Sequence, residues 1–150
     1  MGLENELIDI DSDDSELKLN KSITLTSEGK IRTIKLQLKA ADGSEASIIS
    51  AYRDNNGEYN LSHRKTGDKY KGRGLAGDLL RQMEDTIRAH SGGEQSLIFL
   101  ESNQSSVFTW MEKNGYIFKG GKPDFSKEPI NFDNDGDIWY ENRYRLEKKI

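Results

Sequence analysis

The stretch Lys69-Tyr70-Lys71-Gly72-Arg73-Gly74-Leu75-Ala76 joins a basic loop with two glycines to the start of an amphipathic helix. Apolar residues recur after it at helical spacing and form one stripe: Leu75, Leu79, Leu80, Met83 and Ile87. Polar residues occupy the opposite side: Asp78, Arg81, Gln82, Glu84, Asp85 and Arg88. Ser91-Gly92-Gly93 then ends the predicted helix.

A loop of this kind favours the binding of an anion. The N-terminus of a helix exposes unpaired backbone N–H groups and carries partial positive charge. Gly72 and Gly74 lack side chains where a ligand must approach the backbone closely. Five cations fall within ten residues, against the single acid Asp68: Arg64, Lys65, Lys69, Lys71 and Arg73. The stretch therefore predicts a phosphate or pyrophosphate site, the alternative being a solvated basic loop.

Composition restricts the class of protein. The 150 residues suffice for one domain with a modest core, since 33% are hydrophobic and 32% charged. The chain has no cysteine, which excludes disulfides, zinc–thiolate sites and thiol nucleophiles and fits a reducing compartment. No apolar run approaches the roughly 20 residues of a membrane span, and no signal-peptide core is present. We expect a cytoplasmic protein without a membrane partner.

The net charge of −4 is unevenly distributed. Residues 1–17 hold no base and seven acids: Glu4, Glu6, Asp9, Asp11, Asp13, Asp14 and Glu16. The remainder of the chain is therefore slightly basic. This balance argues against nucleic acid as a partner. Because apolar anchors are few, residues 1–16 are predicted to be a weakly structured acidic arm, either solvated or docked on a partner. Residues 17–150 are predicted to be a single domain.

Before the basic loop, alternation with a period of two predicts β-strands. Two alternating sets carry it: Ile23 and Leu25, then Ile34, Leu36 and Leu38. Ile31 does not fit the parity of the second set, so that strand is expected to begin after it. Turn signals at residues 41–44 and 55–57 lead into further strands at 46–52 and 58–63. The pattern predicts an antiparallel meander.

After the helix, residues 95–100 form a short apolar run typical of a strand buried on both faces. Glu101-Ser102-Asn103 is expected to end this strand and cap a second helix, which stops at Asn114-Gly115. Strands are predicted at 116–118 and 138–146, with a loop at 120–129. The fold class is therefore α/β of the α+β kind. It has a mixed, mostly antiparallel central sheet, an N-terminal β meander, a β-loop-α-β-α unit and C-terminal strands.

Two motifs resemble one family. Lys69-x-x-Gly72-x-Gly74 looks like the (Gln/Arg)-x-x-Gly-x-(Gly/Ala) signature of the GNAT superfamily of N-acetyltransferases. Val107–Tyr116 is similar to the second motif of that family, a helix followed by x-Gly-Phe/Tyr and a strand. The resemblance covers about residues 57–120. Lys69 departs from the preferred Gln or Arg, because lysine keeps the charge but loses the fork geometry.

The resemblance implies a GNAT-like acyltransferase domain with acetyl-CoA as cosubstrate and no metal. Its loop would grip the CoA pyrophosphate through backbone N–H groups. The predicted CoA contacts are Leu61, Ser62, His63, Arg64, Lys69, Tyr70, Lys71, Gly72, Arg73, Gly74, Leu75, Ala76, Asn103 and Gln104. The acetyl group would pass directly, in a ternary complex, to an amine of a protein, a peptide or a small molecule. The chain could act as a homodimer.

Direct transfer needs a base that takes a proton from the acceptor ammonium. Glu58 is the first candidate, eleven residues before Lys69, where histone-modifying relatives carry their catalytic glutamate. Alternation places Glu58 on one strand face with Asn60 and Ser62. The alternative is an exposed glutamate at a sheet edge.

Two other bases come into consideration. His63 has a suitable pKa for this task, but alternation puts it on the opposite face, beside Tyr59 and Leu61. Glu101 is expected at the carboxyl end of the next strand, a position that often borders a crevice.

Direct transfer can also use an acid that protonates the leaving thiolate. Met111 aligns with the position where the family often has a tyrosine, and methionine cannot donate a proton. Tyr116, Ser105, Ser106 or water could act instead, or the step needs no acid. The alternative is a non-catalytic acyl-CoA-binding module that acts as a sensor or interaction domain.

Residues 131–138 imitate the first eight positions of an EF-hand calcium loop. However, Asn142 stands at the twelfth position instead of glutamate, Pro129 precedes the stretch and a strand pattern follows. The sequence predicts a β-turn here. The aromatic residues that follow are expected in the core and on a sheet face: Trp139, Tyr140 and Tyr144.

Overall fold

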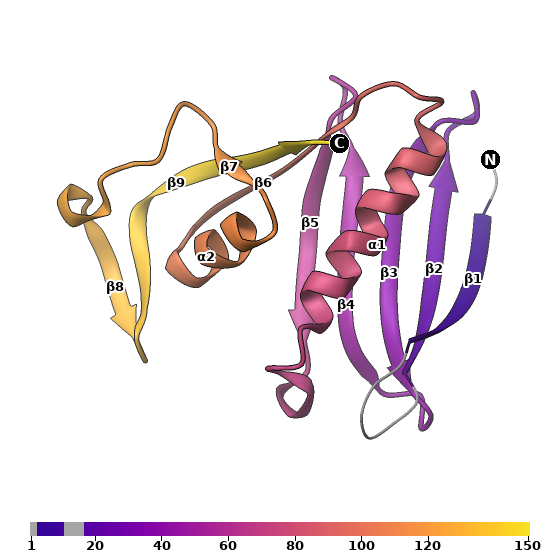
Figure 1. Ribbon diagram of the computed structural model, residues 1–150, viewed down its shortest axis with the longest axis horizontal. Coiled ribbons are helices and arrows are strands. Elements are labelled where there is room, and N and C mark those ends of the chain that lie inside the picture. Colours follow the sequence, from indigo (N-terminus) through magenta and orange to yellow (C-terminus); the bar gives the residue numbers. More distant parts are fainter. Residues whose placement is uncertain (1–2, 11–16) are drawn as a thin grey trace. The chain divides into compact units, whose positions relative to one another are not determined.

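The computed structural model describes residues 3–10 and 17–150, the former by their backbone alone. The chain divides into two compact units, Met1–Ser96 with Ile150 and Leu97–Lys149. The elements of the first unit are β1 (Leu3–Ile10), β2 (Leu17–Leu25), β3 (Ile31–Ala40), β4 (Glu45–Arg53), β5 (Tyr59–Thr66), η1 (Asp68–Tyr70) and α1 (Leu75–His90) (Figure 1). Those of the second are β6 (Leu97–Gln104), α2 (Ser105–Lys113), β7 (Ile117–Phe118), η2 (Phe125–Lys127), β8 (Ile130–Asn134) and β9 (Asp137–Lys149).

The first unit is an antiparallel meander in which each strand from β1 to β5 pairs with the next. Helix α1 crosses one face of this sheet and contacts β3, β4 and β5 (Figure 1). The core lies between them, and its fully buried side chains include Ile34, Leu36, Leu38, Leu79, Leu80, Met83 and Ile87. The predicted meander and the apolar stripe of the helix are confirmed.

One polar residue of α1 differs from the predicted polar side of the helix. Glu84 is only 4% exposed, although the sequence predicts it opposite the apolar stripe. It lies one turn after Leu80, at the border of the stripe, so the buried side of α1 extends to this position. Thr86 is also buried; its hydroxyl donates to the Gln82 carbonyl at 2.7 Å and accepts from Lys21 Nζ at 3.5 Å.

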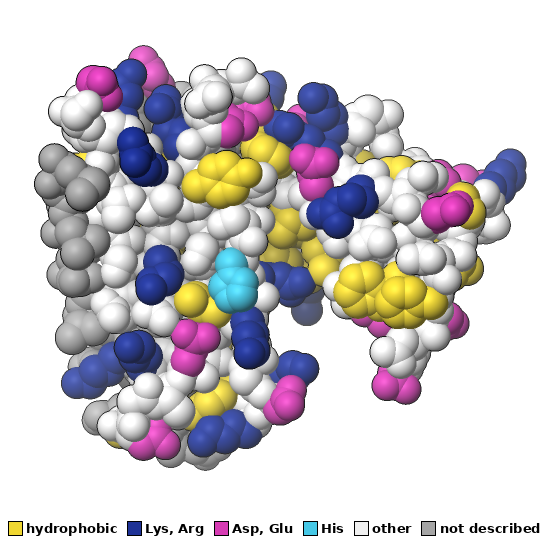
Figure 2. All heavy atoms as spheres, turned by 180° about the vertical axis from the view of Figure 1, so that it is seen from behind, with side chains coloured by type: hydrophobic (Ala, Val, Ile, Leu, Met, Phe, Trp, Pro, Cys, Tyr) yellow, Lys and Arg dark blue, Asp and Glu magenta, His cyan; other side chains and the backbone are white. Residues whose placement is uncertain are grey.

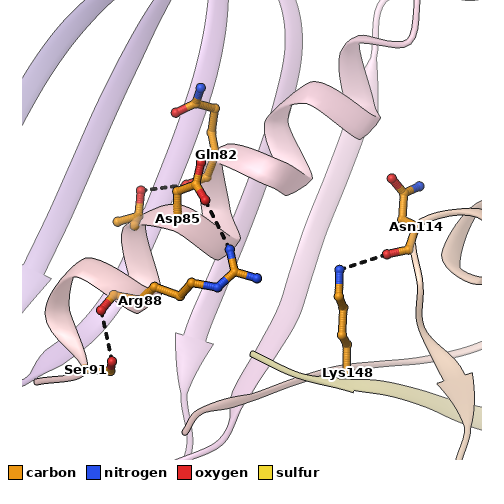
Figure 3. A network of polar contacts seen from close by, with 7 residues as sticks. Gln82, Asp85, Arg88, Ser91, Asn114 and Lys148 are labelled. Carbon is orange, nitrogen blue, oxygen red and sulfur yellow. Dashed lines mark hydrogen bonds and ion pairs between the residues drawn. The ribbon is translucent and has the colours of Figure 1, made fainter. Parts of the chain in front are cut away.

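The end of α1 is closed by local contacts (Figure 3). Arg88 Nη1 lies 3.1 Å from Asp85 Oδ1, one turn back on the exposed side. The Ser91 hydroxyl donates to the Arg88 carbonyl at 2.9 Å and satisfies one of the last carbonyls. The helix therefore ends where the Ser91-Gly92-Gly93 signal predicts.

The start of β3 corrects the sequence prediction. The register between β2 and β3 shifts at Thr24 and Leu25, which leaves Arg32 as an extra residue in a β-bulge. The bulge inverts the alternation, so Ile31 is 5% exposed and belongs to the core despite its parity. The strand begins at Ile31, and the expectation that it begins later is wrong.

The N-terminal region also differs from the expectation. Residues 3–10 form β1, which pairs with β2 from Leu3 opposite Thr24 to Ile10 opposite Leu17. This segment is therefore an element of the sheet, not a weakly structured arm. The remainder of the predicted arm, residues 11–16, lies outside the described residues.

In the second unit, β9 is the central strand and pairs antiparallel with β6, β7 and β8. Helix α2 contacts β6 and β9. An aromatic cluster with ring centroids 4.7–6.5 Å apart fills the unit: Phe108, Phe118, Phe125, Tyr140 and Tyr144. Lys148 Nζ also donates to the Asn114 carbonyl at 3.1 Å (Figure 3). These strands and helices confirm the predicted α+β class.

The stretch that imitates a calcium loop is a β-hairpin between β8 and β9. Asn134 pairs with Asp137, and the two residues between them have positive φ, 52° at Asp135 and 80° at Gly136. This is the geometry of a type I′ hairpin turn, so the predicted turn is confirmed. Strand β8 itself is missed by the sequence prediction. Within the described residues, no group of three or more His, Cys, Asp or Glu could hold a metal ion.

No helix in the described ranges is both long and apolar enough to cross a membrane.

Candidate functional site

The basic loop between β5 and α1 is organised around Tyr70. The η1 turn brings this residue back onto the sheet, where it is 5% exposed, and Gly67 N donates to the Ala46 carbonyl at 2.9 Å. Lys69 Nζ lies 5.1 Å and Arg73 Cζ 5.5 Å from the centroid of the Tyr70 ring. Cations at this range are attracted by an aromatic face. One buried ring therefore positions two cations of the loop.

Gly72 and Gly74 have φ of 83° and 74°, in the left-handed region. A Cβ atom at either position would meet no heavy atom within 4 Å. The backbone conformation thus requires glycine, while the space beside it stays open to a ligand. Leu75 and Ala76, also among the predicted contacts, form the first turn of α1, with Leu75 buried.

The N-terminus of α1 has no side-chain cap. Its N-cap residue is Gly74, and the first helical bond runs from Asp78 N to the Gly74 carbonyl at 3.0 Å. The N–H groups earlier in the first turn have no helical acceptor, as at every helix start. Together with the helix dipole, they make this end of α1 suited to an anion.

Lys71 is paired with a nearby acid. Its Nζ lies 3.0 Å from Asp68 Oδ1, with 64% and 97% of the two side chains exposed. The hydrogen bond and charge of Lys71, with a smaller effect of Lys65, hold the pKa of Asp68 below its ordinary value. Ion pairs this exposed contribute little to stability. Lys71 can therefore exchange this partner for a phosphate group at small cost.

A β-bulge in β5 changes the faces predicted for its residues. Ala51 pairs with Leu61 and Ser50 with His63, so Ser62 is an extra residue. Ala51 and Leu61 are buried, whereas Ser50 and His63 are on the other face of the sheet. The prediction that His63 lies beside Leu61 is therefore wrong. Figure 2 shows the face that α1 leaves uncovered, with Lys and Arg side chains spread over it.

The other polar residues of β5 divide between the two faces. Asn60 is opposite Tyr52, and its Nδ2 donates to the Tyr52 hydroxyl at 3.0 Å. Arg64 is opposite Ile49, on the side that α1 covers. The predicted contacts at 61–64 thus belong to both faces of the strand.

Glu58 lies just before β5, not on it. Its backbone N–H donates to Asp54 Oδ1 at 2.9 Å and belongs to the β4–β5 turn, and its side chain is half-buried. Glu101 is exposed and lies within β6, opposite Arg145, and its carbonyl accepts from Arg143 at 2.8 Å. The expectation that Glu101 ends its strand is wrong, because the ladder with β9 continues to Gln104.

The N-terminus of α2 is capped from a distant part of the sequence. Asp137, at the start of β9, accepts from Ser106 N and Ser106 Oγ at 2.9 Å each and from Gln104 Nε2 at 2.6 Å. Although partial burial acts in the opposite direction, these hydrogen bonds lower the pKa of Asp137. The cap expected from Glu101-Ser102-Asn103 is therefore wrong. The only sequence signal for Asp137 was its place after the Asp-Gly turn.

Two predicted CoA contacts, Asn103 and Gln104, form hydrogen bonds to residues of β9. Asn103 Nδ2 donates to the Tyr140 carbonyl at 2.9 Å, while Gln104 contacts Asp137. Among the candidate acids, Tyr116 is 1% exposed, with Lys148 Nζ 5.6 Å from its ring centroid. Met111 is fully buried.

The fold has counterparts among solved structures. No protein-family model matches the chain, and no curated protein matches its sequence. A Bacillus subtilis acetyltransferase in complex with CoA superposes with a TM-score of 0.59 at 14% identity, over 79% of this chain and 78% of that one. The IAA acetyltransferase of Bacillus cereus gives 0.55 at 15% identity, over 79% of each chain. A Desulfovibrio desulfuricans protein described as an acetyltransferase of the GNAT family gives 0.56 at 16%, over 79% and 69%. The chain has the GNAT fold.

Proposed function

Because the chain has the GNAT fold, we propose that it is an acetyl-CoA-dependent N-acyltransferase. The observation that carries the proposal is the uncapped start of α1, where Gly72 and Gly74 leave open space beside backbone N–H groups. A pyrophosphate fits this arrangement, since it accepts hydrogen bonds and carries the charge that the helix dipole favours. The acceptor would be an amine of a protein or peptide, with a small-molecule amine as the alternative.

The loop cations complete the donor side. Lys69 and Arg73, both held on the Tyr70 ring, would neutralise phosphate oxygens of CoA, with Lys71 as a third cation. Because Tyr70 is buried, two of these charges are positioned before the ligand binds. Such preorganisation reduces the entropy cost of binding.

In the proposed reaction, the amine nitrogen attacks the thioester carbonyl carbon. A C–N bond forms, the C–S bond breaks, and the electron pair leaves on the CoA sulfur. Glu58 is the proposed base that takes the proton from the acceptor ammonium, with Glu101 as the second candidate. Since Met111 cannot donate a proton and Tyr116 is only 1% exposed, water is the proposed acid that protonates the thiolate, with Ser105 and Ser106 as the alternatives.

The donor site can be tested by one substitution and a matched control. Gly72→Asp places a carboxylate beside the proposed pyrophosphate position, so acetyl-CoA binding measured by isothermal titration calorimetry should be lost. Gly120→Asp is the control, because Gly120 has φ 80° and, like Gly72, would place a Cβ in open space. The same backbone strain then falls in the loop after β7, outside the predicted CoA contacts. Equal acetyl-CoA affinity in both variants would refute the site.

One observation favours a second function, a non-catalytic module that binds acyl-CoA. Met111 occupies the place of the family's tyrosine and is fully buried, so it neither donates a proton nor reaches a ligand. Acetyl transfer to a panel of amines by the wild type and Glu58→Gln separates the two functions. Binding of acetyl-CoA without turnover on any acceptor would support the module.

A further inference from the structure

A cavity of about 360 Å³ lies at the end of the first unit remote from the basic loop. The β2–β3 turn, the β4–β5 turn and the segment that follows α1 form it. Its polar lining includes Lys30, Arg53, Tyr59, His90, Ser91 and Glu94. This volume is within the range of small-molecule sites. The proposed acyl transfer does not use this cavity.

Arg53 is held in place at the wall of the cavity. The β4–β5 turn gives Gly57 a φ of 79°, and a Cβ there would come within 3.0 Å of Arg53 Nη2. The missing side chain thus lets the guanidinium lie against the turn. Arg53 also hydrogen-bonds Tyr59, whose burial raises the pKa of its hydroxyl while Arg53 partly opposes this. Tyr59 therefore stays neutral at physiological pH and leaves the charge of Arg53 uncompensated.

Lys30 adds a second positive charge. Its backbone is fixed by the β2–β3 turn, where Thr26 N donates to the Lys30 carbonyl at 2.7 Å. Among the residues that the structure describes, Glu28 interacts electrostatically with Lys30, whereas no ion pair is found for Arg53. A guanidinium fork and an ammonium at one polar cavity are the groups that bind an oxyanion.

The remaining lining restricts the charge of the ligand. Glu94 and the C-terminus of α1, which carries partial negative charge, also border the cavity. Both disfavour a second anionic group. We infer that this cavity binds a small molecule through a single carboxylate or phosphate group held by Arg53 and Lys30.

The inference can be tested by ¹⁵N–¹H correlation spectra of the full chain during titration with inorganic phosphate and, separately, with acetate. The amide signals of Gly57 and Ser91 report on the cavity, and those of Gly72 and Gly74 report independently on the basic loop. We expect the cavity signals to shift and saturate in the millimolar range with at least one probe. Saturation by phosphate alone or by acetate alone identifies which anion the site prefers.

Arg53→Gln should raise the apparent Kd about tenfold, a loss of about 1.4 kcal/mol. Lys30→Gln, in an exposed turn, should weaken binding without affecting the fold. Arg81→Gln is the control, because Arg81 is a surface arginine on α1 outside the cavity lining. Absence of saturable shifts, identical shifts with sodium chloride at equal ionic strength, or an unchanged Kd in both cavity variants would overturn the inference.

Discussion

Replacing Asp137 with alanine should destabilise the unit formed by residues 97–149. The Asp137 carboxylate accepts three hydrogen bonds at the start of α2, from Ser106 N, Ser106 Oγ and Gln104 Nε2. Loss of an N-cap typically costs about 1 kcal/mol, and the hydrogen bond from Gln104 to a charged acceptor adds about 1 kcal/mol at this half-buried position. We therefore expect a loss of about 2 kcal/mol in the free energy of unfolding.

Tryptophan fluorescence during thermal unfolding measures this effect. Both tryptophans of the chain, Trp110 and Trp139, lie in the unit concerned. For a chain of this size, a loss of about 2 kcal/mol corresponds to a decrease in Tm of roughly 4–8 °C. Asp133→Ala is the matched control, since Asp133 is an exposed residue of the same hairpin. Its effect should stay within about 0.5 kcal/mol. Equal Tm values for the two variants would refute the capping role.

The cap also predicts a dependence on pH. The pKa of Asp137 is lower in the folded protein than its ordinary value, about 3.9 in an unfolded chain. Such a group stabilises the fold fully above its unfolded pKa, and the contribution is lost as pH falls through the folded pKa. The difference in stability between the wild type and Asp137→Ala should therefore be constant at neutral pH and shrink below about pH 4. A difference that persists at the lowest pH where the protein folds would mean that the charge plays no part.

Three further substitutions test the proposed donor site, the proposed base and the core. Tyr70→Leu keeps an apolar anchor but removes the ring beneath Lys69 and Arg73, so the acetyl-CoA Kd from calorimetry should rise about three- to tenfold while Tm changes little. Glu58→Gln should lower kcat for acetyl transfer by at least about 100-fold and leave the acetyl-CoA Kd unchanged; an unaltered kcat excludes Glu58 as the base. Leu80→Ala should lower the free energy of unfolding in urea by about 2–5 kcal/mol, because Leu80 of α1 is fully buried in the core of the first unit.

The elements around the proposed donor site were predictable because their signals are local. Alternation defines β5, two glycines mark the loop, and the apolar stripe defines α1, all within residues 58–90. Each pattern depends on neighbours within a few positions, and the structure reproduces them. What the sequence does not show is the burial of Tyr70, since a tyrosine within a run of cations has no local sign of being an anchor.

The errors in the strands come from register, which is a property of two segments. Arg32 is an extra residue because of the register in which β3 pairs with β2, and Ser62 because of the register in which β5 pairs with β4. Each bulge inverts the alternation of inward and outward side chains. The bulge at Arg32 places Ile31, which precedes it, in the core, and the bulge at Ser62 places His63, which follows it, on the opposite face. An argument from the alternation of one strand cannot detect either change. The prediction of a strand face for Glu58 also depends on alternation within β5, but Glu58 precedes that strand.

The region after Leu100 shows why polar character is an ambiguous signal. The polar stretch Glu101-Ser102-Asn103 predicts a strand end with a cap, yet β6 continues through it to Gln104, and the cap comes from Asp137. The aspartates after Pro129 were compared with a calcium loop, in which glycine at the sixth position makes a sharp turn. A type I′ hairpin needs a glycine at the same point for its positive φ, so Gly136 fits both structures. The role of the Asp137 carboxylate distinguishes the hairpin from a calcium loop. Asp137 accepts hydrogen bonds from α2, and that assignment requires knowing that residues 31 positions apart are in contact.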